Sequence, residues 1–207
     1  MNEPTSADDY ETRILQALRN ADPHVLDERK RAFDGVVYLS QCRLFREYVR
    51  LDDFETVLAG AHAAYGWMPR ILRSVDGDAV TALAARLEGF RGMSHPATAL
   101  RAFQLFDNDE REQACRFVNG SVTGSSKFLH FLSPRSFPIW DSRIARVLRT
   151  RPSETTRVSN YVAYWEALAR CIEKPEAQQV AQVLGGEASP LRQVEYALYL
   201  LGPRDED

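Results

Sequence analysis

Two side chains that could do chemistry together lie in the middle of the chain, 14 residues apart. Lys127 carries an amine and Asp141 a carboxylate, and each stands at or near the start of an expected helix. A desolvated lysine amine can act as a nucleophile, and a carboxylate can stabilise a developing positive charge. The structural alternative for Asp141 is an ordinary helix N-cap, a role that aspartate often fills.

The run from Gly120 to Lys127, Gly-Ser-Val-Thr-Gly-Ser-Ser-Lys, predicts a joint between two helices. Gly120 and Gly124 allow a tight turn with positive φ, and Ser125 or Ser126 can cap the helix that follows. Exposed N–H groups at such a helix start can hold a DNA phosphate. The run does not end in Gly-Lys-Ser/Thr and no buried strand precedes it, which argues against a nucleotide triphosphate loop.

Basic residues gather around the same segment. From Lys127 to Arg157 there are seven basic residues and two acidic ones, a local charge of +5 in a chain of net charge −3. We expect the arginines at 143, 146, 149 and 151 to form one positive patch that binds phosphates. The alternative is a solvated helix face that happens to use arginine.

The cysteines and histidines do not form the spacings of a metal site. Cys42, Cys115 and Cys171 lie far apart without a C-x-x-C pair, and the four histidines form neither H-x-H nor H-x-x-x-H. This pattern argues against a zinc ribbon and against a cysteine-ligated iron–sulfur cluster. We therefore expect no metal and no cofactor, with the cysteines packed as small apolar residues.

The segment from Gly124 to Leu148 resembles the helix-hairpin-helix DNA glycosylases. It contains Gly-Ser-Ser-Lys127 and then Phe137-Pro-Ile-Trp-Asp-Ser-Arg-Ile-Ala-Arg-Val-Leu148. In that family a glycine hairpin is followed by a lysine in some members, and then by an aspartate that opens a helix. The similarity covers about 30 of the 207 residues, and the hairpin lacks the family's Leu-Pro-Gly-Val-Gly sequence.

The resemblance implies roles for individual residues. Asp141 falls on the family's catalytic aspartate and Lys127 on the lysine of its bifunctional members, while Ser142, Arg143 and Arg146 follow the aspartate. Such enzymes rotate the target base into an aromatic pocket.

Three aromatic residues could line such a pocket, although a place in the core is the simpler expectation for each: Trp67, Trp140 and Tyr65. His130, one turn from Lys127, could share the environment of the lysine, although a solvated histidine is the simpler expectation.

The remaining sequence predicts an all-α protein, because apolar residues recur with the helical period and glycines follow the expected helix ends. Expected helices span 8–20, 27–50, 53–65, 78–89, 97–106, 109–118, 125–132, 141–150, 156–173 and 189–201, with a short one possible at 175–184. Only Val36–Leu39 and Phe137–Trp140 look strand-like, and both are too short and isolated to build a sheet.

The length of 207 residues fits one globular domain of two packed helical halves, with a possible division near 92–96 between residues 8–91 and 97–202. There is no apolar stretch of the roughly 20 residues that a membrane span needs, and residues 1–9 lack a signal pattern. We therefore expect a cytoplasmic protein that does not enter a membrane.

The sequence thus favours a DNA-binding protein with possible base-excision activity, in which Gly120, Gly124, Ser125, Ser126, Arg143, Arg146 and Arg149 contact DNA. The rival hypothesis is a non-catalytic helical interaction protein, for example an accessory component of a bacterial defence or toxin system. In that case Asp141 would only cap its helix, and the arginines would meet an acidic protein partner. A helical nuclease is a weaker third possibility, because no paired-carboxylate metal motif is visible.

Overall fold

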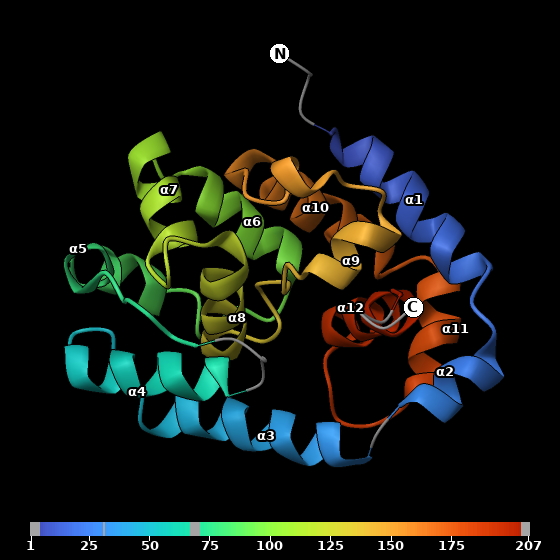
Figure 1. Cartoon of the computed structure of the whole chain (residues 1–207), viewed down its shortest axis with the longest axis horizontal. Helices are drawn as coiled ribbons and strands as arrows, with labels where there is room; N and C mark the ends of the chain where they lie inside the picture. The colour runs from blue at the N-terminus through green and yellow to red at the C-terminus, as the bar shows by residue number, and fades with distance from the viewer. Residues whose placement is uncertain (1–4, 31, 67–70, 204–207) are drawn as a thin grey trace.

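The computed structural model describes the backbone of residues 5–30, 32–66 and 71–203, and this part of the chain is all-α. The helices are α1 Ala7–Arg19, α2 Pro23–Arg29, α3 Ala32–Glu47, α4 Phe54–Tyr65, α5 Gly77–Glu88, α6 Pro96–Gln104, α7 Asn108–Arg116, α8 Val122–Leu132, α9 Ser142–Val147, α10 Val158–Cys171, α11 Pro175–Leu184 and α12 Pro190–Leu201, with a 3-10 turn at Pro152–Glu154 (Figure 1). Within the described ranges, β-type pairing is limited to an isolated bridge between Val75 and Val118.

Side-chain caps fix where several helices begin. The Asp53 carboxylate accepts a hydrogen bond from Glu55 N at 3.1 Å and starts α4, and the Ser189 hydroxyl accepts one from Arg192 N at 3.2 Å at the start of α12. Each cap satisfies an N–H group that has no partner inside the helix. The helix starts expected at these two positions are confirmed.

One expectation about the first fifty residues is wrong. The single helix expected at 27–50 is two helices, α2 and α3, with an extended residue, Lys30, between them. Tertiary contacts fix the break, because the Arg29 side chain donates to Leu200 O at 2.7 Å and Lys30 Nζ donates to Val183 O at 3.1 Å. The strand-like run Val36–Leu39 lies within α3, since a short apolar run does not distinguish a helix from a strand.

The helices pack as two groups, which their contacts distinguish. In one group, α3, α4 and α7 contact α8, and α5 contacts α4 and α7. In the other, α1 packs along α10 and against α11 and α12, while α2 contacts α11 and α12 and α9 contacts α12. The first two helices therefore return to the C-terminal part of the chain, and α8 lies near the middle of the molecule (Figure 1).

A single buried apolar cluster runs through both groups, from Tyr10 in α1 to Leu200 in α12. Cys115 and Cys171 are buried in it as free thiols, and Cys42 is half-buried.

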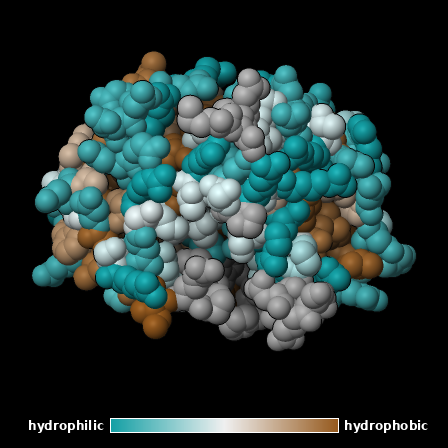
Figure 2. Space-filling model, turned by 45° about the horizontal axis from the view of Figure 1, so that its top comes forward, coloured by the Kyte–Doolittle hydropathy of each residue, from teal (hydrophilic) through white to brown (hydrophobic). Residues whose placement is uncertain are grey.

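None of the helices in the described part is long and apolar enough to cross a membrane. The face shown in Figure 2 is mostly hydrophilic, with apolar side chains in separate small groups.

Candidate active site around Lys127 and Asp141

The turn before α8 is tighter than the glycine spacing predicts. Asn119 and Gly120 have positive φ angles of 54° and 59°, and Ser121 is the N-cap, with its hydroxyl accepting from Gly124 N at 3.4 Å. Gly120 is exposed and forms the tip of the hairpin. The helix thus begins at Val122, and the expected start at 125 with a cap from Ser125 or Ser126 is wrong.

Gly124, Ser125 and Ser126 lie inside α8 and are buried, so they do not offer an open phosphate-binding surface. Gly124 permits close packing, because a Cβ atom there would lie 2.5 Å from the Tyr65 hydroxyl oxygen. The hydroxyl oxygen of Ser125 accepts from Val118 N at 3.0 Å, and that of Ser126 accepts from Trp140 N at 3.0 Å. Both serines therefore hold neighbouring backbone in place.

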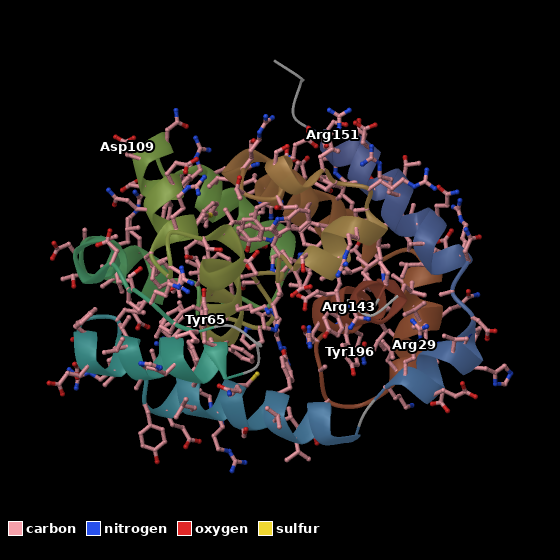
Figure 3. All side chains as sticks on the ribbon, in the orientation of Figure 1. Arg29, Tyr65, Asp109, Arg143, Arg151 and Tyr196 are labelled. Carbon is pink, nitrogen blue, oxygen red and sulfur yellow. The ribbon has the colours of Figure 1, made fainter. Side chains whose placement is uncertain are left out.

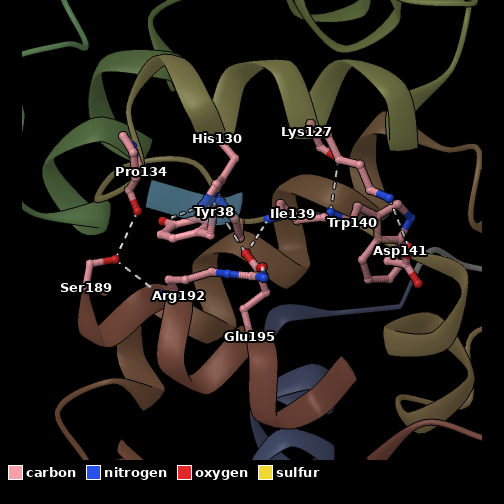
Figure 4. A network of polar contacts seen from close by, with 12 residues as sticks. Tyr38, Lys127, His130, Pro134, Ile139, Trp140, Asp141, Ser189, Arg192 and Glu195 are labelled. Atoms are coloured by element: carbon pink, nitrogen blue, oxygen red, sulfur yellow. Dashed lines mark hydrogen bonds and ion pairs between the residues drawn. The ribbon is translucent and has the colours of Figure 1, made fainter. Parts of the chain in front are cut away.

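The connector, which we define as residues 137–141, is an extended segment that leads from α8 to α9. Its polar backbone groups bind side chains from three helices, and Figure 4 labels two of these side chains, His130 and Glu195. Phe137 O accepts from His130 Nδ1 at 2.7 Å, Pro138 O accepts from the Tyr161 hydroxyl at 3.0 Å, and Ile139 N donates to Glu195 Oε2 at 2.6 Å. These contacts replace the ladder partners that a strand would supply.

Lys127 and Asp141 meet at the end of the connector. Lys127 Nζ lies 3.3 Å from Asp141 Oδ2, and the two side chains are 8% and 16% exposed (Figure 4). The other carboxylate oxygen, Oδ1, accepts from Arg143 N at 2.8 Å and caps α9. The structure thus brings together the two residues singled out from the sequence, and Asp141 both caps its helix and pairs with the amine.

The electrostatics of the pair favour a reactive amine. Burial lowers the pKa of Lys127 below its ordinary value of 10.5, and the neighbouring Asp141 carboxylate opposes that effect. Burial acts this way because it disfavours the charged ammonium form. The result is a larger share of neutral, nucleophilic amine at neutral pH than an exposed lysine has.

The three arginines after Asp141 have different surroundings. Arg143 donates to Gly202 O at 2.8 Å and lies over the ring of Tyr199, so it is engaged within the protein. Arg149 has a φ of 52° and is exposed, and its left-handed backbone ends α9. Arg146 is exposed as well. In Figure 3, Arg151 lies near the start of α1 and Arg143 in another part of the view.

Two of the aromatic residues that could line a base pocket, Trp140 and Tyr65, are buried. Trp140 is fully buried, its ring packs edge-on against Tyr10, and its Nε1 donates to Thr155 O at 2.8 Å. It therefore belongs to the core rather than to an open pocket. Trp67 lies outside the described residues.

A second ion pair, missed from the sequence, lies at the other side of the connector. The Arg192 guanidinium contacts the Glu195 carboxylate, and Glu195 is fully buried. Burial raises the pKa of Glu195 to about 7, with Arg192 opposing the rise. One signal was available, because Glu195 lies on the apolar stripe of its helix, four residues after Leu191 and three before Leu198.

His130 is also buried, so the expectation of a solvated histidine is wrong. Its Nδ1 must carry the hydrogen, since Phe137 O can only accept, and its Nε2 lies 3.0 Å from the Tyr38 hydroxyl. Burial lowers the pKa of His130 to about 3, and the Arg192 charge adds to that effect. The ring is therefore neutral, and Nε2 accepts the Tyr38 hydroxyl hydrogen.

Within the described ranges, histidine, cysteine and acidic side chains do not gather in any group of three or more that could hold a metal ion. The groups that Lys127 and Asp141 bring to the site are an amine and a carboxylate. A comparison of the chain with protein-family models, curated proteins and solved structures finds no match.

Proposed function

We propose that the protein binds DNA and breaks a base–sugar bond, as the DNA-repair glycosylases that its central segment resembles do. The observation that carries the proposal is the 3.3 Å approach of the Lys127 amine to the Asp141 carboxylate, both largely buried. Among buried lysines, one with a lowered pKa beside a carboxylate is a candidate nucleophile.

The two residues have complementary tasks in this reaction. The neutral Lys127 amine attacks C1′ of the nucleotide, the new C–N bond forms, and the base leaves with the electron pair of the bond that breaks. Asp141 stabilises the positive charge that develops on the sugar and takes a proton from the attacking amine. The C1′–O4′ bond then breaks, O4′ takes the proton from Asp141, and the opened sugar is left as a Schiff base on Lys127, which permits strand cleavage.

The DNA contacts come from exposed groups near the pair. Gly120 lies at the tip of the hairpin that starts α8, and Arg146 and Arg149 lie on the outer side of α9 and at its end. Neutralising phosphates releases counterions, so affinity should fall steeply with salt. Arg149→Gln should weaken duplex binding and reduce its salt dependence, whereas Arg46→Gln, an exposed change in α3, should do neither.

The direct test is borohydride trapping on duplexes that carry damaged bases or an abasic site. Wild type should form a covalent protein–DNA adduct, and Lys127→Gln should form none while it still releases base by a water-dependent route. If wild type neither binds duplex or single-stranded DNA at low salt nor forms any adduct, the proposal fails.

A second candidate function is a non-catalytic interaction protein that uses the arginines toward an acidic partner. It is favoured by the engagement of Asp141, whose two oxygens already accept from Arg143 N and Lys127 Nζ, and by the net charge of −3. Equal base release by wild type and Asp141→Asn would assign Asp141 to capping and would favour this candidate.

A further inference from the structure

Two buried side chains hold the connector in the position that presents Asp141 to Lys127. Ser126 accepts from Trp140 N at 3.0 Å and Glu195 accepts from Ile139 N at 2.6 Å (Figure 4). We propose that Ser126 and Glu195 are positioning residues of the candidate active site, an inference that rests on the function proposed above. Ser126 is 1% and Glu195 0% exposed, and each binds a backbone N–H group of the connector rather than Lys127 or Asp141 themselves.

The connector depends on such contacts because its own sequence does not fix its path. It lies outside any helix, and Pro138 has no N–H group. Ile139 N and Trp140 N are therefore the two successive donors that precede Asp141, and each is bound by one side chain. Loss of either acceptor would leave a buried N–H group without a partner, which costs free energy until the segment shifts.

The two contacts made by α8 are in register with each other. Ser126 binds Trp140 and Lys127 binds Asp141, and each pair spans 14 residues. The Ser126 hydroxyl donates to Thr123 O at 3.0 Å, which leaves its oxygen lone pairs for Trp140 N. Adjacent residues of one helix thus hold adjacent residues of the connector.

Glu195 is itself held in place from the opposite side of the connector. Its second oxygen pairs with the Arg192 guanidinium, which lies 5.0 Å from the centre of the Tyr38 ring and 5.1 Å from that of Tyr196. A buried carboxylate is stable only when paired and hydrogen-bonded. The bond to Ile139 N is thus a fixed point for the connector.

The first experiment measures the Lys127 amine directly and needs no substrate. The chain has three lysines, so selective isotope labelling gives three side-chain NMR signals, and loss of one in Lys127→Gln identifies Lys127. Ser126→Ala should let Asp141 move away, and the pKa of Lys127 should fall by about one unit as it loses an opposite charge. Ser125→Ala removes an equally buried hydroxyl that binds Val118 N instead, and should leave that pKa unchanged.

The second experiment separates the hydrogen bond of Glu195 from its charge. Arg192→Met with Glu195→Gln removes both charges and keeps an acceptor for Ile139 N, whereas Arg192→Met with Glu195→Leu removes both charges and the acceptor. Both double variants are uncharged at these positions and should fold, since apolar residues often replace a buried ion pair without loss. Only the leucine variant should lower the Lys127 pKa and shift the pH profile of borohydride trapping to lower pH.

Equal Lys127 pKa values in Ser126→Ala and Ser125→Ala, together with equal values in the two double variants, would overturn the positioning roles. Absence of trapping in wild type would instead refute the proposed chemistry. The two failures are distinguishable, because the NMR measurement reports on the Lys127–Asp141 pair whether or not the protein acts on DNA.

Discussion

The two ion pairs at the connector, the outer pair Lys127–Asp141 and the inner pair Arg192–Glu195, have the same charges but different access to water. The outer side chains are 8% and 16% exposed, and the carboxylate also caps α9. The inner side chains are 10% and 0% exposed, and the guanidinium lies between two tyrosine rings. The two cations are about equally buried, so the difference lies in the carboxylates: that of Asp141 is partly exposed, whereas that of Glu195 is fully buried and binds the backbone at Ile139.

The largest expected effect concerns the outer pair. Asp141→Asn keeps an oxygen that can accept from Arg143 N, so α9 should still form, but it removes the charge that would stabilise a sugar cation. Base release should fall about a hundredfold or more. The assay is incubation with damaged-base duplexes followed by alkali and gel analysis, with circular dichroism as the control for folding. Unchanged release would leave Asp141 as a cap alone.

The next effect contrasts the two cations. Arg192→Met leaves a buried carboxylate without its partner and should cost about 3 kcal/mol of unfolding free energy. Lys127→Met should cost about 1 kcal/mol, because Asp141 keeps its bond from Arg143 N and some exposure to water. Urea unfolding measures both, with Arg46→Met in α3 as the exposed control. Equal losses would abolish the distinction between an outer and an inner pair.

A smaller effect tests whether His130 is buried away from water, as its 0% exposure indicates. Below its ordinary pKa of 6.5, His130 takes up a proton in the unfolded chain but not in the fold, where its pKa is about 3, so acid should destabilise the protein. His130→Asn keeps a donor for Phe137 O and removes this titration.

Between pH 6.5 and about 5, wild type should lose roughly 2 kcal/mol more stability than His130→Asn. Burial raises the pKa of Glu195 to about 7, so its protonation on acidification should stabilise the fold. This contribution is present in both proteins and cancels in the difference between them. Denaturant unfolding at several pH values measures both proteins. Parallel pH profiles would mean that water reaches the histidine.

The last effects concern two glycines, Gly120 in the turn before α8 and Gly124 inside that helix. Gly124→Ala would place a Cβ atom 2.9 Å from Val118 O and should cost about 2 kcal/mol. Gly120→Ala meets open space, but its φ of +59° is unfavourable for alanine, so about 1 kcal/mol is expected. Thermal unfolding of both variants measures the order, and a larger loss at Gly120 would mean that the hairpin conformation matters more than packing.

Several local features of the fold could be predicted because neighbouring residues decide them. Asp53 and Ser189 each bind an N–H group two or three residues away, so their helix starts are visible in the sequence. The end of α9 could not be predicted in this way. The sequence predicts a helix that continues to residue 150, whereas α9 ends at Val147. Arg149 adopts the left-handed conformation after the helix, and Thr150 N donates to Ala145 O at 2.8 Å. Glycine is the usual residue in that conformation, and its absence here hides the helix end in the sequence.

Helical periodicity and residue type are local properties of the chain, so the all-α class and the candidate residues Lys127 and Asp141 could be predicted from the residues alone. Tertiary structure alone decided that Ser126 faces the connector, that Trp140 packs in the core and that Glu195 reaches Ile139 across 56 residues. The reason is that a buried polar group must find a partner wherever the fold provides one, and that partner can lie anywhere in the sequence.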